Sequence, residues 1–266
     1  MSTSTTRGAA SGARRAFEFQ LLRYRRTWRG SIAGTLLNPL FFLGALGIGL
    51  GHFVDRNGAV SALGGRDYLS YLAPGLLAST AMQVGMGEAA WPILGGVLWT
   101  KDYLAMINTP LEVTDVMLGH LAFIAMRITT AVGIFLAAMA AFGTWHSPLA
   151  LLAWPAATLT GLSFVTPLAA FSVTREEDNA FTWLFRFFVT PVFLFSGAFF
   201  PISQLPSALQ TVAKLTPLWH GVELCRALTL GRVHGAGALV HVVVLAAYVT
   251  VGLILSRRGY RARLAR

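Results

Sequence analysis

Apolar residues in this chain gather in long runs, and short polar or basic stretches separate the runs. A helix that crosses a bilayer needs about 20 consecutive, mostly apolar residues. Runs of that length predict six membrane spans, at residues 31–53, 68–98, 110–142, 149–173, 179–200 and 236–255. The pattern therefore predicts an all-α membrane protein.

The stretch 190–231 begins as the end of the fifth span but does not become a polar loop. Pro201, Pro206 and Pro217 break a continuous helix there, because proline lacks an N–H and clashes with the preceding turn. The apolar segment after Pro217 is too short to cross a bilayer, and runs of about 10–14 residues are typical of re-entrant or interfacial helices. We expect residues 203–230 to form two short helices at the outer membrane face, between the fifth and sixth spans.

Residues 16–28, ahead of the first span, predict an amphipathic interfacial helix. Phe17, Leu21 and Tyr24 fall on one helical face, and arginines fall on another. Such a helix lies on the cytoplasmic leaflet with its basic face toward anionic lipid, although an ordinary soluble helix has the same pattern. Residues 1–15 are mostly small and polar and are predicted to be disordered.

Composition and charge agree with the span pattern. Of the 266 residues, 55% are hydrophobic and 12% are charged, which is typical of a polytopic membrane protein. The net charge of +10 could indicate nucleic-acid binding, but the arginines concentrate at the two ends of the chain. That placement is typical of cytoplasmic termini, so we expect both termini in the cytoplasm and no nucleic-acid partner. Residues 16–266 are expected to form a single transmembrane domain.

The sequence contains no motif that we recognise for catalysis, cofactor binding or metal binding. A Walker A loop needs Gly-Lys-Ser/Thr, but the only lysines, Lys101 and Lys214, are followed by Asp102 and Leu215. The histidines form no HExxH motif, and no GxSxG serine motif is present. The acidic residues 176–178 are interpreted as helix-capping carboxylates, because a helix N-terminus favours negative charge.

Ionisable residues inside predicted spans are costly and mark functional sites by default. In this chain they are Glu88, Arg127 and Arg186, with His120 as a further candidate. Glu88 and Arg186 fall near the ends of spans, where the side chain can also reach the interface without any special role. Arg127 lies deeper, and we expect it to have a partner.

Residues 100–112 join the second and third predicted spans. Thr109, Pro110 and Glu112 match a capping box with proline at the first helical position, which predicts a helix start at Pro110. Residues 101–108 supply one or two helical turns before it. A stiff segment with a direct route into a span is suited to transmit force from a partner, although a simple connecting loop is the alternative.

Two stretches resemble a known family. Residues 194–231, LFSGAFFPISQLPSALQTVAKLTPLWHGVELCRALTLG, resemble the signature region of ABC type-2 exporter permeases, in the branch of nodulation lipo-oligosaccharide and antibiotic-resistance exporters. The positions that match there are Ser196, Gly197, Phe200, Pro201, Leu205, Pro206, Pro217 and Arg226. Residues 102–119, DYLAMINTPLEVTDVMLG, resemble the family's loop between spans 2 and 3, and Glu88 stands where the family often has a glutamate. His220-Gly221 differs from the commoner dipeptides, which leaves the substrate open.

The resemblance implies a transmembrane subunit that forms a homodimer and pairs with two copies of a separate ATP-binding ABC subunit. The partner would bind ATP and magnesium, so this chain itself would need no cofactor and would not be an enzyme. It would export an amphipathic drug, lipid or glycolipid across the plasma membrane of a bacterium. A membrane enzyme acting on lipid-linked substrates and a secondary transporter are the alternatives.

The resemblance also assigns roles to residues. Coupling to the ATPase is expected at Lys101, Asp102, Tyr103, Leu104, Ile107, Thr109, Pro110 and Glu112. Tyr103, Leu104 and Ile107 would enter a groove of the partner, with Lys101 and Asp102 at its polar rim. The substrate path is expected at Phe181, Phe185, Phe188, Phe193 and Phe195, and the re-entrant exit at Ser196, Gly197, Pro201, Pro206, Pro217 and Arg226.

Overall fold

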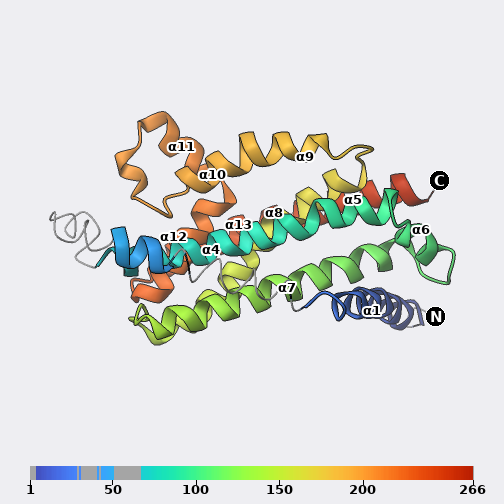
Figure 1. The fold of residues 1–266 in the computed structure, drawn as a ribbon, viewed down its shortest axis with the longest axis horizontal. Coiled ribbons are helices and arrows are strands. Elements are labelled where there is room, and N and C mark those ends of the chain that lie inside the picture. Colours follow the sequence, from blue (N-terminus) through green and yellow to red (C-terminus); the bar gives the residue numbers. More distant parts are fainter. Residues whose placement is uncertain (1–3, 29, 31–40, 42, 51–66, 266) are drawn as a thin grey trace.

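A computed structural model describes residues 4–28, 30, 41, 43–50 and 67–265. Every regular element in these ranges is helical, so the all-α prediction is confirmed (Figure 1). The elements are α1 (Ser4–Tyr24), η1 (Leu43–Leu50), α4 (Tyr68–Ala89), α5 (Trp91–Leu98), α6 (Asp102–Ile107), α7 (Val113–Ala141), η2 (Pro148–Leu152), α8 (Ala153–Val173), α9 (Asn179–Leu184), η3 (Phe185–Val189), α10 (Thr190–Phe195), η4 (Ile202–Gln204), α11 (Ser207–Leu215), α12 (Pro217–Leu230) and α13 (Gly235–Leu264). Most of the predicted first span, 31–53, lies outside the described residues.

Three helical segments in the described ranges are long and apolar enough to cross a membrane. They are Val113–Ala141, Pro148–Val173 and Gly235–Leu264, and they correspond to the predicted third, fourth and sixth spans. With 29 residues, α7 rises about 43 Å and exceeds a hydrocarbon core of about 30 Å. The chain is therefore a multi-pass membrane protein, and the count of six spans stays a prediction.

The predicted second and fifth spans are interrupted helices. The second, 68–98, divides into α4 and α5 at Ala90, which has a non-helical ψ of −93° and lies two residues before Pro92. The fifth, 179–200, contains the π-helical turn η3 and ends as a helix at Phe195. Proline causes both interruptions in part, because Pro92 and Pro191 cannot donate to a carbonyl one turn earlier.

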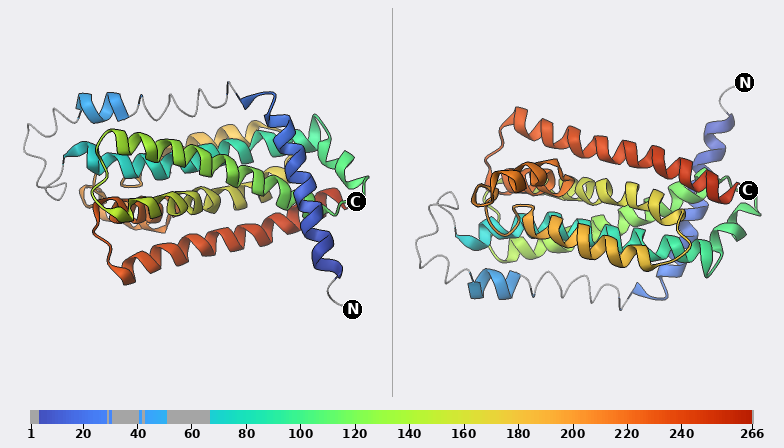
Figure 2. Two further views of the ribbon diagram at one scale, coloured as in Figure 1. Left: turned by 90° about the horizontal axis from the view of Figure 1, so that it is seen from below. Right: turned by 90° about the horizontal axis from the view of Figure 1, so that it is seen from above.

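The helix α1 begins at Ser4, so most of the segment predicted to be disordered, 1–15, is helical. It packs across α7, where Gly119 leaves room for the side chain of Ala16. Figure 2 shows α1 crossing the long helices at one end of the bundle. Tertiary packing against α7 thus orders residues whose composition alone indicated disorder.

The centre of the bundle is α8, against which α4 and α13 pack closely. Ser256 of α13 donates to the carbonyl of Thr166 in α8 at 2.7 Å. α13 continues to Leu264, beyond the predicted end at 255, because the basic residues of its last turns are good helix formers. Both chain ends lie at one end of the bundle with α6, which we call the basic end, and α11 and α12 lie at the other, the hairpin end (Figure 1).

Topology can be tested by thiol labelling, because the native cysteine is silent. Cys225 is fully buried, and burial raises the pKa of its thiol to about 12, so little reactive thiolate forms. We expect Gln204→Cys and Lys214→Cys, both at exposed positions, to react with an impermeant maleimide added outside intact cells. The wild-type chain is the control and should stay unlabelled. Labelling of these cysteines only after the cytoplasmic face is opened would reverse the predicted topology.

Candidate functional site

The short helix α6 at the basic end is held by a charged contact with α1. Lys101 precedes it with a left-handed φ of 54°. The carboxylate of Asp102 accepts from Arg23 of α1 at 2.8 Å and from the hydroxyl of Thr100 at 2.8 Å. The sequence predicted Asp102 at the polar rim of a partner's groove. In the structure its carboxylate is instead bound to α1. A helix of 6 residues has little stability alone, so these contacts fix its position.

Tyr103 points into the protein, and the prediction that it enters a partner's groove is wrong. Its side chain is 1% exposed, its hydroxyl bonds to Nδ1 of His120 in α7, and its ring contacts Tyr260 of α13. Burial raises the pKa of Tyr103 well above its ordinary value, which keeps the hydroxyl neutral. Leu104 is 39% exposed and Ile107 is half-buried, so these two stay available for a partner.

The capping box that begins α7 lies one turn later than predicted. Glu112 is the N-cap residue, and its N–H donates to the carboxylate of Asp115 at 3.1 Å. Thr109 instead donates to the carbonyl of Met106 at 2.6 Å and closes the turn after α6. The helix starts at Val113 and not at Pro110. Glu112 forms its capping box with Asp115, whereas the sequence predicted a capping box between Thr109 and Glu112.

The buried charge of Arg127 in α7 has close partners, whose identity the sequence did not predict. Nε of Arg127 donates to Glu88 of α4 at 3.0 Å, and Nη1 donates to the hydroxyl of Tyr24 in α1. The guanidinium also lies over the Tyr24 ring, 4.4 Å from its centroid. The arrangement joins three elements around one cation. Arg186, the third predicted charge, is exposed on η3.

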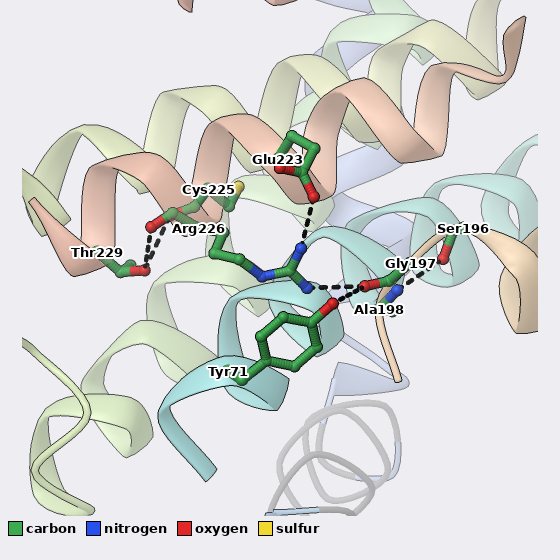
Figure 3. A network of polar contacts seen from close by, with 8 residues as sticks. All are labelled: Tyr71, Ser196, Gly197, Ala198, Glu223, Cys225, Arg226 and Thr229. Carbon is green, nitrogen blue, oxygen red and sulfur yellow. Dashed lines mark hydrogen bonds and ion pairs between the residues drawn. The ribbon is translucent and has the colours of Figure 1, made fainter. Parts of the chain in front are cut away.

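At the hairpin end, the two halves of the signature region meet at the carbonyl of Gly197. This oxygen accepts from Arg226 of α12 at 2.7 Å and from the hydroxyl of Tyr71 in α4 at 3.2 Å (Figure 3). The guanidinium lies 3.9 Å from the Tyr71 ring centroid and also pairs with Glu223 at 2.6 Å. Gly197 has a φ of 81°, a conformation that favours glycine, so the chain can turn here.

The predicted exit residues around this carbonyl have local structural roles. Ser196 is buried, and its hydroxyl donates to the carbonyl of Phe193 and accepts from the N–H of Ala198. Pro201 and Pro206 precede η4 and α11, and Pro217 is the first residue of α12. The two short helices therefore form as predicted, with proline at the start of each element.

The unusual dipeptide His220-Gly221 in α12 has three close contacts. A Cβ at position 221 would overlap the side chain of Thr160 in α8, so the helices approach each other here. Nε2 of His220 lies 3.0 Å from the carbonyl of Lys214, and its Nδ1 lies 2.8 Å from Nδ1 of His241 in α13. A carbonyl only accepts, so Nε2 of His220 carries the hydrogen and Nδ1 accepts from His241.

The five predicted path phenylalanines do not share one surface. Phe181 is fully buried against Trp91 and Phe171, which excludes it from a path lining. Phe185 also contacts Trp91, and Phe193 packs edge-on against Phe199. Phe188 and Phe195 are exposed. The prediction is therefore wrong for Phe181, because its ring is packed between α5 and α8.

The most exposed aromatic pair of this segment is not among the residues predicted from the sequence. Trp183 and Phe187 are 65% and 63% exposed, and their rings stack with centroids 5.0 Å apart. Their i, i+4 spacing was a usable signal, since residues four apart are neighbours on a helix. They form an apolar surface available to lipid, cargo or another protein.

Comparison with known sequences defines the class of this membrane protein. The family model of the ABC-2 type transporter matches residues 14–230, so the chain belongs to this family of transport permeases. Nodulation protein J of Rhizobium leguminosarum bv. viciae is 33% identical over 249 residues, covering 92% of each chain. Nodulation protein J of Bradyrhizobium diazoefficiens is 32% identical over 249 residues, covering 92% of this chain and 91% of the relative. The resemblance inferred from the two sequence stretches is confirmed.

The Glu88–Arg127 pair predicts a large stability effect. Glu88→Ala leaves the guanidinium buried without its carboxylate, which should cost about 3–5 kcal/mol. Replacing both residues with leucine should cost less than Glu88→Ala alone, because no uncompensated charge remains. Unfolding of the purified chain in detergent measures both, with Arg186→Ala as a control that should change stability by less than about 0.5 kcal/mol. Equal effects of Glu88→Ala and Arg186→Ala would contradict the pairing.

The histidine pair predicts acid sensitivity. Burial and the neighbouring His241 lower the pKa of His220, opposed by the Lys214 carbonyl. Because the folded pKa lies below the ordinary value of about 6.5, the unfolded chain binds the proton first, and stability falls as pH drops below about 6.5. Glu223 and Trp219 also lie beside the pair.

We expect the melting temperature to fall less between about pH 7.5 and pH 5 in His220→Gln than in the wild type, as histidine titrates in that range. His146→Gln is the matched control, because His146 lies two residues before η2 and outside the pair. This variant should keep the wild-type pH response. An unchanged pH response in His220→Gln would show that the pair is not responsible.

Proposed function

We propose that this chain is the membrane-spanning subunit of an ATP-driven exporter. Two copies would assemble with two ATP-binding ABC subunits in the bacterial cytoplasmic membrane, with both termini in the cytoplasm. The partner would bind ATP and magnesium, and this chain would conduct an amphipathic drug, lipid or glycolipid outward. Membership of the ABC-2 family supports this over the membrane enzyme and the secondary transporter, since its permeases normally pair with an ATP-binding subunit.

One observation carries the proposal: α6 is attached to the spans by two separate routes. Tyr103 connects it to α7 and α13 through His120 and Tyr260. Asp102 connects it to Arg23 of α1, and the next residue, Tyr24, contacts Arg127. Movement of α6 would therefore reach α4 and α7 together. A connecting loop without a role in coupling would not need two separate anchors, one of them buried.

The basic end also offers a surface for the partner. A groove of about 510 Å³ lies between the linker after α6 and the last turn of α13, with Ile107, Leu111, Arg261 and Leu264 among its lining residues. Leu104 is exposed on the same short helix as Ile107. Apolar side chains flanked by Arg261 and Glu112 suit a partner surface with an apolar centre and a charged rim.

The direct test is Leu104→Asp. A charge at this exposed apolar contact should leave the permease in the membrane but abolish co-purification with its ATP-binding subunit, or uncouple ATP hydrolysis from export. The matched control is Leu149→Asp, which alters a leucine of similar exposure (40% against 39%) in η2 at the hairpin end. The control should retain both activities.

Normal binding and export by Leu104→Asp would overturn the assignment of coupling to α6. The coupling contact would then belong to the amphipathic segment 17–28 of α1, which the same assay can test through Trp28→Asp. Loss of both activities in Leu149→Asp as well would mean that the charge acts through folding.

A further inference from the structure

An apolar cavity of about 460 Å³ lies between α8, the α9–η3 segment and the junction of α11 with α12. Its lining includes Phe164 and Leu168 of α8, Leu184 and Phe188 of the fifth segment, and Val212 and Leu215 of α11. This volume falls in the range of about 300–1,000 Å³ that small-molecule sites occupy. None of the coupling contacts described above involves it.

All three hydroxyl groups of the lining are already used by the protein. Ser163 donates to the carbonyl of Thr160 at 2.6 Å, and Thr216 donates to that of Ala213 at 2.7 Å. Tyr248 of α13 donates to the carbonyl of Leu215 at 2.8 Å. No hydroxyl hydrogen of the lining remains for a ligand, so the cavity offers mainly apolar contact.

Neither water nor vacuum fills such a cavity well. A buried water needs two to four polar partners, and in this lining the hydroxyl hydrogens are already used. An empty space forfeits the dispersion contacts of every wall atom. The walls belong to helices of a membrane protein, so hydrocarbon is the material at hand. Along α8 the cavity extends from Phe164 to Phe171. This seven-residue separation corresponds to about 10 Å, a length that suits an extended acyl chain.

We propose that this cavity binds one acyl chain of a bilayer phospholipid, with the headgroup outside. Phe188, Val212 and Leu215 are exposed at its rim, which gives the chain an entrance from the bilayer. The bound acyl chain fills the space between α11 and the π-helical turn η3, so it holds the hairpin end against η3. The site uses none of the coupling contacts at α6, although Phe188 belongs both to this lining and to the predicted substrate path.

Photo-crosslinking tests this proposal on the full chain. The permease is reconstituted, without its ATP-binding subunit, in vesicles of phosphatidylethanolamine and phosphatidylglycerol that contain a phospholipid with a mid-chain diazirine. After irradiation, peptide mapping should find adducts on Phe164 and Leu168, each only 5% exposed and reached through the cavity. Val243, exposed on α13 outside the cavity, should be labelled as the reference for ordinary lipid contact.

Two variants fill the cavity from different walls, so failure of one to fold leaves the test intact. Leu184→Trp and Val212→Trp should each cause loss of the adducts at Phe164 and Leu168 while the Val243 adduct persists. Absence of the two adducts in the wild type, or their persistence in both variants, would overturn the proposal.

Labelling of Phe164 and Leu168 by a diazirine-bearing alkyl glycoside but not by the phospholipid would also overturn it, in favour of a cargo chain. Since no ATPase or transport is measured, the outcome is distinct from that of the Leu104→Asp test.

Discussion

The guanidinium of Arg127 is the group on which the arrangement at the basic end depends. A charge buried among membrane helices is tolerated only with close partners, and Glu88 and Tyr24 provide them from two other elements. The need to satisfy one cation therefore determines where α1 and α4 lie relative to α7. Because Arg23 adjoins Tyr24 and binds Asp102, the position of α6 follows from the same constraint.

A matching constraint acts at the hairpin end, where the backbone leaves the helical state. Non-helical carbonyl groups at membrane depth must find donors within the protein. Gly197 has two, from Arg226 and Tyr71, so α12 and α4 together close the turn after α10. One arginine at the hairpin end and one near the middle of α7 thus each join three elements.

The sequence predicted the elements better than their boundaries and contacts. Long apolar runs and proline positions are local signals, so the main spans and the two short helices were predictable. The start of α7 was not, because Glu112 has two candidate partners and only the fold selects Asp115. The inward direction of Tyr103 and the burial of Phe181 depend on neighbours far along the chain, namely His120, Tyr260 and Trp91. Arg127 was predictable because a deep charge requires a partner whatever the fold.

The contact between Gly221 and Thr160 has an evolutionary consequence. No atom can be added at position 221 while the threonine keeps its place on α8. A homologue with a larger residue at 221 must therefore have a smaller one at 160, or a wider separation of these two helices. Positions 221 and 160 are therefore expected to change together during divergence.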